Sequence, residues 1–229
     1  MRQTLEQGLS MLSTQICPQA VDRLLKFSEM LLEKNKVMNL TAVTEPMEVV
    51  TRHFLDCAVL MSRMISGEKV LDVGTGAGFP GLPLAILCPE SEFVLIDALR
   101  KRMDFLNEVI DTLDLKNVKA IHARAEEFAR EHRGAFDCAV SRAVADLSML
   151  SELTLPLVKT GKRLCGGSKA SGRGGANFRR RSGTSDSISG TGQRDSACDC
   201  KDSKKQGNPN KISAAFRENQ RCAARREIK

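Results

Sequence analysis

Short apolar segments alternate with amphipathic segments along the middle of this 229-residue chain, and this alternation limits the folds open to it. Four segments have the length of strands: 69–73, 93–97, 118–122 and 136–141. Each of them is followed by a predicted helix: 80–87, 100–113, 124–131 and 146–158. Such alternation is typical of an α/β protein with a doubly wound, Rossmann-like parallel sheet.

The residues before and after this alternation divide the chain into three predicted parts. Three helices are expected ahead of the core: 4–16, 18–34 and about 46–64. We therefore expect an N-terminal helical extension over 1–66 and an α/β core over 67–161. The alternation stops at Gly161, where a further strand should begin, so the last strands of the sheet are predicted to be missing.

The remaining residues, 162–229, differ in composition from the rest of the chain. They hold 17 Lys and Arg against 6 Asp and Glu, whereas residues 1–161 hold 18 against 22. They also contain 9 of the 17 Gly, but only four Ile, Leu, Val or Met residues. Such a segment cannot bury enough apolar surface to offset its chain entropy, so we expect a basic, disordered tail.

Several classes of protein are excluded by features that the sequence lacks. No apolar run reaches the length of a transmembrane helix, and the N-terminus carries an acid at Glu6 in place of the apolar core of a signal peptide. The eight Cys are scattered without a Cys-x-x-Cys pair, which suits reduced thiols. Cys198 and Cys200 supply too few ligands for a closed zinc site. We expect a cytoplasmic protein with no bound metal and no membrane partner.

A glycine-rich turn follows the first predicted strand and contains Gly74, Gly76 and Gly78. Gly lets the backbone approach a ligand closely, and ligands of doubly wound sheets bind beyond the carboxyl ends of the strands. Asp97 ends the next strand, where a carboxylate can accept hydrogen bonds from both hydroxyls of a ribose. Gly74, Gly76 and Asp97 therefore predict a nucleoside site. The structural alternatives are a tight turn and a helix N-cap.

Two further charged residues are predicted near the same edge of the sheet. Glu126 follows the third strand, where it could read an adenine edge or serve as a first-turn helix acid. Arg142 ends the fourth strand, and a structural ion pair is its alternative role. No Walker Gly-Lys-Ser/Thr segment is present, which leaves hydride transfer with NAD or methyl transfer with S-adenosylmethionine (SAM). A dehydrogenase is disfavoured because no acid/base arrangement for hydride transfer is visible.

The glycine turn and its strand, Val-Leu-Asp-Val-Gly-Thr-Gly-Ala-Gly, resemble the first motif of SAM-dependent methyltransferases. Four segments together resemble one family more closely: 35–42 (Asn-Lys-Val-Met-Asn-Leu-Thr-Ala), 52–56 (Arg-His-Phe-Leu-Asp), 70–84 and 141–145 (Ser-Arg-Ala-Val-Ala). That family is the bacterial glucose-inhibited division protein B group, the small-subunit rRNA methyltransferase G. The resemblance covers residues 1–161. It implies methyl transfer from SAM to N7 of a guanine in 16S rRNA of the small ribosomal subunit, and we expect a monomer.

The resemblance also implies roles for individual residues. The implied cofactor contacts are Gly74, Phe79, Ala125, Glu126 and Arg142. The implied RNA-facing positions are Asn39, His53, Arg100, Lys101 and Arg102. A structural role is the alternative for His53, and the solvated start of a helix is the alternative for 100–102. No catalytic side chain is assigned, because guanine N7 already carries a lone pair and no proton must leave before attack.

The tail departs from the pattern of this family, whose members continue with a strand after the position of Gly161 and end in a basic segment containing Lys-Tyr-Pro-Arg. Codons can be chosen for residues 207–224 that encode a segment with Lys-Tyr-Pro-Arg-Arg when read one base later. Residues 163–168 and 194–203 yield apolar segments in the same way. We interpret the C-terminal third as frameshifted. The alternatives to an active enzyme are an RNA-binding protein that uses its basic tail and an inactive frameshifted product.

Overall fold

A computed structural model describes residues 1–12, 16–142, 147–167 and 176–179 of the chain. A six-stranded sheet lies at its centre, in the order β3-β2-β1-β4-β5-β6. The strands are β1 (Lys69–Val73), β2 (Glu92–Asp97), β3 (Val118–His122), β4 (Phe136–Arg142), β5 (Val158–Gly167) and β6 (Ala176–Arg179). The first five are parallel and β6 is antiparallel to β5. The predicted α/β fold with a parallel sheet is confirmed.

The helices of the N-terminal part precede this sheet: α1 (Arg2–Ser10), α2 (Pro18–Met38), α3 (Pro46–Val49), η1 (Val50–Phe54), α4 (Leu55–Ala58) and η2 (Val59–Arg63). Pro18 occupies the first turn of α2, where its missing N–H costs nothing, and Asn39 ends that helix in the left-handed conformation. The helix predicted over 46–64 is confirmed in outline. It contains a π-helical segment, η1, and ends as the 3₁₀ helix η2.

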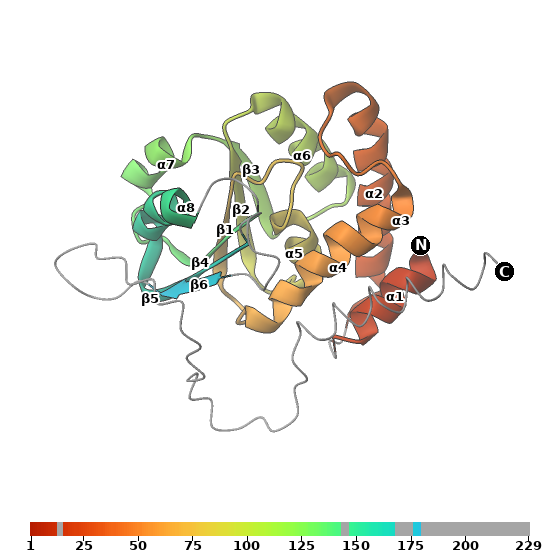
Figure 1. Cartoon of the computed structure of the whole chain (residues 1–229), viewed down its shortest axis with the longest axis horizontal. Helices are drawn as coiled ribbons and strands as arrows, with labels where there is room; N and C mark the ends of the chain where they lie inside the picture. The colour runs from red at the N-terminus through yellow and green to blue at the C-terminus, as the bar shows by residue number, and fades with distance from the viewer. Residues whose placement is uncertain (13–15, 143–146, 168–175, 180–229) are drawn as a thin grey trace, which may run out of the picture.

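The remaining helices alternate with the strands and cover both faces of the sheet: α5 (Gly81–Leu87), α6 (Arg100–Thr112), α7 (Ala125–Glu131), α8 (Leu147–Thr154) and η3 (Leu155–Leu157). Figure 1 shows α5, α6 and the N-terminal helices on one side of the sheet, with α7 and α8 on the other. Because side chains alternate along a strand, Val70 joins the larger core with the N-terminal helices, whereas Leu71 and Val73 pack against Phe128 and Phe136. The helical extension therefore shares one hydrophobic core with the sheet.

The sheet continues past Gly161, so the prediction that the alternation stops there is wrong. β5 spans this position and pairs in parallel with β4, with Leu164 opposite Ala139, and β6 adds a further strand. A strand ladder is built from backbone N–H and C=O groups, which Gly and basic residues supply as well as apolar ones. The apolar contribution here is small, because Val158 and Leu164 form only a minor cluster with Ala139.

The expected disorder of the tail concerns residues that, apart from β5 and β6, lie outside the described part of the chain. Among the helices that the structure describes, none is long and apolar enough to cross a membrane. The described residues also contain no group of three or more His, Cys, Asp or Glu side chains that could hold a metal ion.

Candidate functional site

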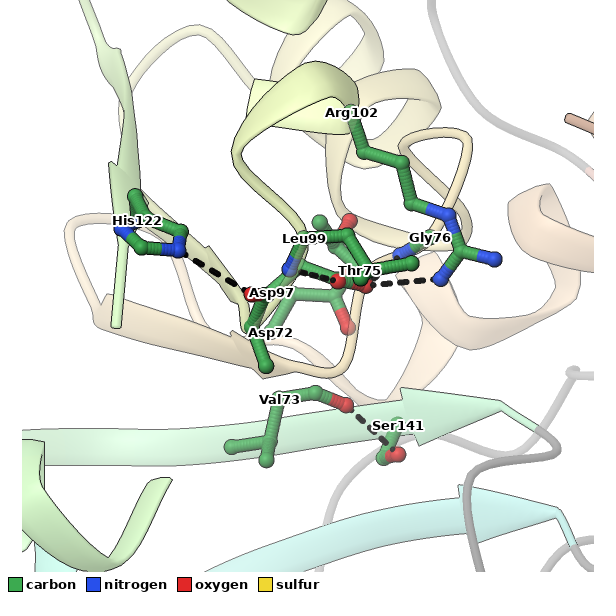
Figure 2. Close-up of polar contacts among 10 residues, drawn as sticks. Asp72, Val73, Thr75, Gly76, Asp97, Leu99, Arg102, His122 and Ser141 are labelled. Carbon is green, nitrogen blue, oxygen red and sulfur yellow. Dashed lines mark hydrogen bonds and ion pairs between the residues drawn. The ribbon is translucent and has the colours of Figure 1, made fainter. Parts of the chain in front are cut away.

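The glycine-rich turn is held against the carboxyl end of the neighbouring strand. The N–H groups of Gly74 and Thr75 both donate to the carbonyl oxygen of Ile96, at 2.9 and 3.1 Å. Gly76 has a φ of +61°, and a Cβ at this position would point into open space. The Gly76 N–H donates to Asp97 Oδ2 at 3.0 Å (Figure 2). There is room for a side chain at position 76, so glycine is favoured there by the left-handed backbone conformation and not by lack of space.

A buried carboxylate supports the turn from below. Asp72 is fully buried, and its Oδ2 accepts the Thr75 hydroxyl at 2.7 Å and the Gly81 N–H at 2.8 Å. Any Cβ on Gly81 would lie 2.7 Å from the same oxygen and 2.2 Å from Leu95, so only glycine fits there. Burial raises the pKa of Asp72 to about 6, although these two hydrogen bonds and the charge of Arg142 act in the opposite direction.

Asp97 lies at the end of β2 and carries three hydrogen bonds. Oδ1 accepts the N–H of Leu99 at 2.9 Å, and Oδ2 accepts Gly76 and the Arg102 guanidinium, the latter at 3.3 Å (Figure 2). The bond to Leu99 is a local turn contact of the kind that Asp makes to the residue two positions later. Asp97 is thus both part of the chain turn before α6 and a wall of the space above the glycine turn.

A cavity of about 540 Å³ opens at the carboxyl ends of β1, β2 and β4. It is the size of a small-ligand site, and its position is the one at which doubly wound sheets bind ligands. Seven of its lining residues are predicted site residues: Gly74, Gly76, Phe79, Asp97, His53, Arg102 and Arg142. The tertiary structure brings these together from the helical extension and the core.

An arginine, a histidine and a phenylalanine pack together on one wall of the cavity. Arg142 Nη2 lies 2.8 Å from His53 Nδ1, and its guanidinium lies over the ring of Phe79 at 5.0 Å. The His53 ring stacks on Phe79 with 4.4 Å between centroids, and its Nε2 lies 3.1 Å from Thr41 Oγ1. Burial, followed by the charge of Arg142, lowers the pKa of His53 to about 4.

Five predicted site residues do not line the cavity: Asn39, Arg100, Lys101, Ala125 and Glu126. Glu126 is exposed in the first turn of α7, and Ala125 packs beside the core of that side. Arg100 and Lys101 are exposed at the start of α6, and Asn39 is exposed at the end of α2.

Sequence reasoning assigned no role to the other lining residues: Leu40, Thr41, Thr75, Ala77 and Ala98. Thr75, Ala77 and Ala98 are direct neighbours of Gly74, Gly76 or Asp97 along the chain, so proximity to these predicted residues was the available signal. Nothing in the local pattern indicates that Leu40 and Thr41 reach the same space.

The fold and the cavity together define a doubly wound α/β protein with a ligand site at the carboxyl ends of its strands. Residues 20–166 match the family described as GidB, rRNA small subunit methyltransferase G. Because this match covers more than half of the chain, the chain belongs to that family.

Relatives that are named ribosomal RNA small subunit methyltransferase G are close in sequence. The protein of Desulfitobacterium hafniense (strain Y51) is 50% identical over 145 residues, which cover 61% of this chain and 60% of the relative. The protein of Lachnoclostridium phytofermentans is 48% identical over 162 residues, which cover 69% of this chain and 67% of the relative. The chain thus spans 60–67% of the length of these relatives.

Among solved structures, a SAM-dependent methyltransferase from Aquifex aeolicus is similar with a TM-score of 0.44 and 18% sequence identity. The likeness covers 62% of this chain and 78% of that one. At this level of similarity it says nothing about activity.

Proposed function

We propose that this chain binds SAM in the cavity above the glycine turn and transfers the methyl group to N7 of a guanine in 16S rRNA of the small ribosomal subunit. Membership in the family supports the reaction. The observation that carries the site is the hydrogen bond from Gly76 to Asp97, because it joins the turn of β1 to the acid of β2 beside one cavity. The further proposed cofactor contacts are Gly74, Phe79, Ala125, Glu126 and Arg142.

The proposed chemistry asks for alignment more than for a reactive side chain. Guanine N7 attacks the methyl group of the sulfonium with its own lone pair, so positioning of the two substrates can supply most of the rate enhancement. Burial raises the pKa of the Cys57 thiol to about 12 and that of Cys88 to about 11. These thiols stay protonated at neutral pH and are unsuited to act as nucleophiles.

Three of the five predicted RNA-facing residues lie outside the cavity, whereas His53 and Arg102 line it. Arg100 and Lys101 are exposed at the start of α6, and Asn39 is exposed at the end of α2. Exposed cations bind phosphates without reading sequence, so they would fix the orientation of the RNA. We further propose that the chain acts as a monomer in the cytoplasm.

Thermal unfolding of the 229-residue chain with and without SAM tests the binding step first. A cooperative transition that moves to higher temperature with SAM is expected, because a ligand that binds only the folded state stabilises it. The Asp97→Asn chain serves as the matched control and should show a smaller shift. A transition that SAM leaves unmoved would contradict the proposed site. Transfer of a labelled methyl group from SAM to small ribosomal subunits then tests the reaction itself.

The charge of residues 162–229 favours a second candidate function, RNA binding through a basic tail. This segment holds 17 Lys and Arg against 6 Asp and Glu. Binding by such a tail would ignore SAM and would weaken steeply with added salt, because each neutralised phosphate releases a counterion. Affinity for unrelated RNAs, measured at several salt concentrations, separates this candidate from the methyltransferase.

We also propose that the residues after about Gly161 arise from a frameshift. The match to the family ends at residue 166, near the start of the Gly- and Ser-rich segment. The coding DNA decides the question: a reading frame that restores an apolar strand and the Lys-Tyr-Pro-Arg ending is expected. A coding sequence with no such frame would refute the proposal. The frame-restored chain should unfold at a higher temperature, since apolar strands in place of the Gly-rich and basic segment would bury more apolar surface.

A further inference from the structure

His53 is held in the cavity wall by contacts on both ring nitrogens. It lies in the π-helical segment η1, a type of helical irregularity that is frequent at functional sites. Nδ1 faces Arg142 Nη2 at 2.8 Å and Nε2 faces Thr41 Oγ1 at 3.1 Å. The ring is stacked on Phe79 at the same time. Three separate elements therefore fix the plane and the rotation of the imidazole.

These contacts determine where the proton of His53 lies. A guanidinium can only donate, so Nδ1 must accept from Arg142 and cannot carry a hydrogen. The neutral ring therefore carries its proton on Nε2, from where it donates to the Thr41 hydroxyl. Burial and the charges of Arg142 on β4 and Arg52 on η1 disfavour the imidazolium and lower the pKa of His53, although a backbone hydrogen bond with Arg52 acts in the opposite direction. This agrees with the geometry, because a second proton on Nδ1 would break the bond to Arg142.

Thr41 is itself anchored to the helical extension. Its N–H donates to Asn35 Oδ1 at 2.9 Å, and its carbonyl accepts from Asn35 Nδ2 at 3.0 Å. Asn35 is largely buried in the last turns of α2. A continuous hydrogen-bonded chain thus runs from α2 through Thr41 and His53 to Arg142, at the end of the central strand β4.

We infer that His53 is a positioning residue, neutral with its proton on Nε2, which holds the Arg142 guanidinium in place for the ligand of the cavity. Arg142 also donates from Nη1 to the carbonyl of Arg52 at 3.4 Å, which uses one further donor. A guanidinium has five N–H groups, so the described contacts leave donors available for an anionic group. This inference rests on the proposed function only in taking Arg142 as a contact of SAM. It replaces the expectation that His53 faces RNA.

Nitrogen NMR of the full chain, labelled with ¹⁵N-histidine, tests the state of the ring without any ligand. The chain has three His, and the signal that is absent from the spectrum of the His53→Asn variant is assigned to His53. We expect His53 to show an unprotonated Nδ1 and a protonated Nε2, unchanged down to about pH 5. A proton on Nδ1, or titration near pH 6.5, would overturn the inference. This result is independent of whether the chain binds SAM.

Binding of SAM to three single variants and one double variant tests the positioning role. His53→Asn keeps an acceptor oxygen near the place of Nδ1, whereas His53→Phe keeps the stacked ring and loses the acceptor. We expect His53→Phe to weaken SAM binding about tenfold, the affinity equivalent of one charge-assisted hydrogen bond, and His53→Asn to stay within about threefold of the parent. In an Arg142→Ala background, His53→Phe should have no further effect.

These variants distinguish positioning by His53 from cofactor binding by Arg142. Equal losses for His53→Asn and His53→Phe, or a full additional loss in the Arg142→Ala background, would refute positioning through Arg142. An Arg142→Ala chain that binds SAM as tightly as the parent would instead refute the proposed role of Arg142 in cofactor binding. Thermal unfolding of each variant without SAM identifies any that fail to fold. If the His53→Phe chain does not fold, a loss of SAM binding in a folded His53→Asn chain would still count against the inference.

Discussion

Arg102 Nη1 and the Gly76 N–H share one oxygen of Asp97, at 3.3 and 3.0 Å. Asp97 is nearly buried and Arg102 is about one third exposed, so this ion pair lies at the rim of the cavity. The carboxylate that is proposed to bind the two ribose hydroxyls therefore already accepts three donors. A carboxylate can accept about four hydrogen bonds, so Asp97 has one acceptor site left. The two hydroxyls of a ribose would need two such sites.

Replacement of Arg102 by Gln is expected to tighten SAM binding. Loss of the guanidinium frees one acceptor site on Asp97, and the ion pair that is given up is partly exposed and weak. We expect the Kd for SAM to fall about two- to fivefold, as measured by calorimetry. Lys101→Gln removes the same charge from the neighbouring exposed position and should leave the Kd unchanged. Weaker SAM binding in Arg102→Gln would mean that the arginine contacts the cofactor.

Asp97→Asn is expected to weaken SAM binding at least tenfold. The amide can still accept from Gly76, but it presents one oxygen in place of two and carries no charge. The glycine turn should stay in place because Gly74 and Thr75 remain bonded to Ile96. Unfolding in the absence of SAM should therefore change little, whereas the shift that SAM produces should shrink. A full SAM shift in Asp97→Asn would refute the proposed ribose contact.

Asp72 should make the stability of the folded chain depend on pH. Its folded-state pKa, about 6, lies above the ordinary value of 3.8, so the folded state binds the proton more tightly than the unfolded state does. By linkage, this contribution is largest at low pH and is lost as pH rises through about 4 to 6. We expect the free energy of unfolding, relative to Asp72→Asn, to fall by about 3 kcal/mol over that range and to stay level above about pH 7.

The comparison with Asp72→Asn is needed because His53 acts in the opposite direction. Its folded-state pKa of about 4 lies below 6.5, so its contribution is present above pH 6.5 and is lost as pH falls. The difference between the parent chain and Asp72→Asn cancels this effect, which both share. Urea unfolding of both chains at several pH values measures this difference in the free energy of unfolding. A difference that is constant between about pH 4 and 7 would contradict the raised pKa of Asp72.

Gly81→Ala is expected to destabilise the core although it adds only one methyl group. The new Cβ would meet Leu95 at 2.2 Å and the Asp72 carboxylate at 2.7 Å, and both neighbours are buried. Overpacking of this kind costs about 1–3 kcal/mol. If Gly81→Ala unfolded at the same urea concentration as the parent chain, that result would contradict the close contact.

Much of the sheet was predictable from local pattern. β1 and β3 have the predicted bounds because the alternation of short strands with helices is visible without tertiary information. The same holds for the glycine turn and Asp97, since their spacing follows from one strand and one helix. β5 was missed at Gly161 because the prediction required apolar side chains, whereas the neighbouring strand β4 needs only backbone partners.

The class of fold, the edge of the sheet at which the site forms and the residue types available there follow from residues that are close in the chain. The contacts of His53 with Thr41 and Arg142, and of Arg102 with Asp97, were not predictable in this way. These contacts depend on how the N-terminal helices pack on α5 and on the register of parallel strands. Side-chain packing across many residues sets both, so no short segment of the sequence records them.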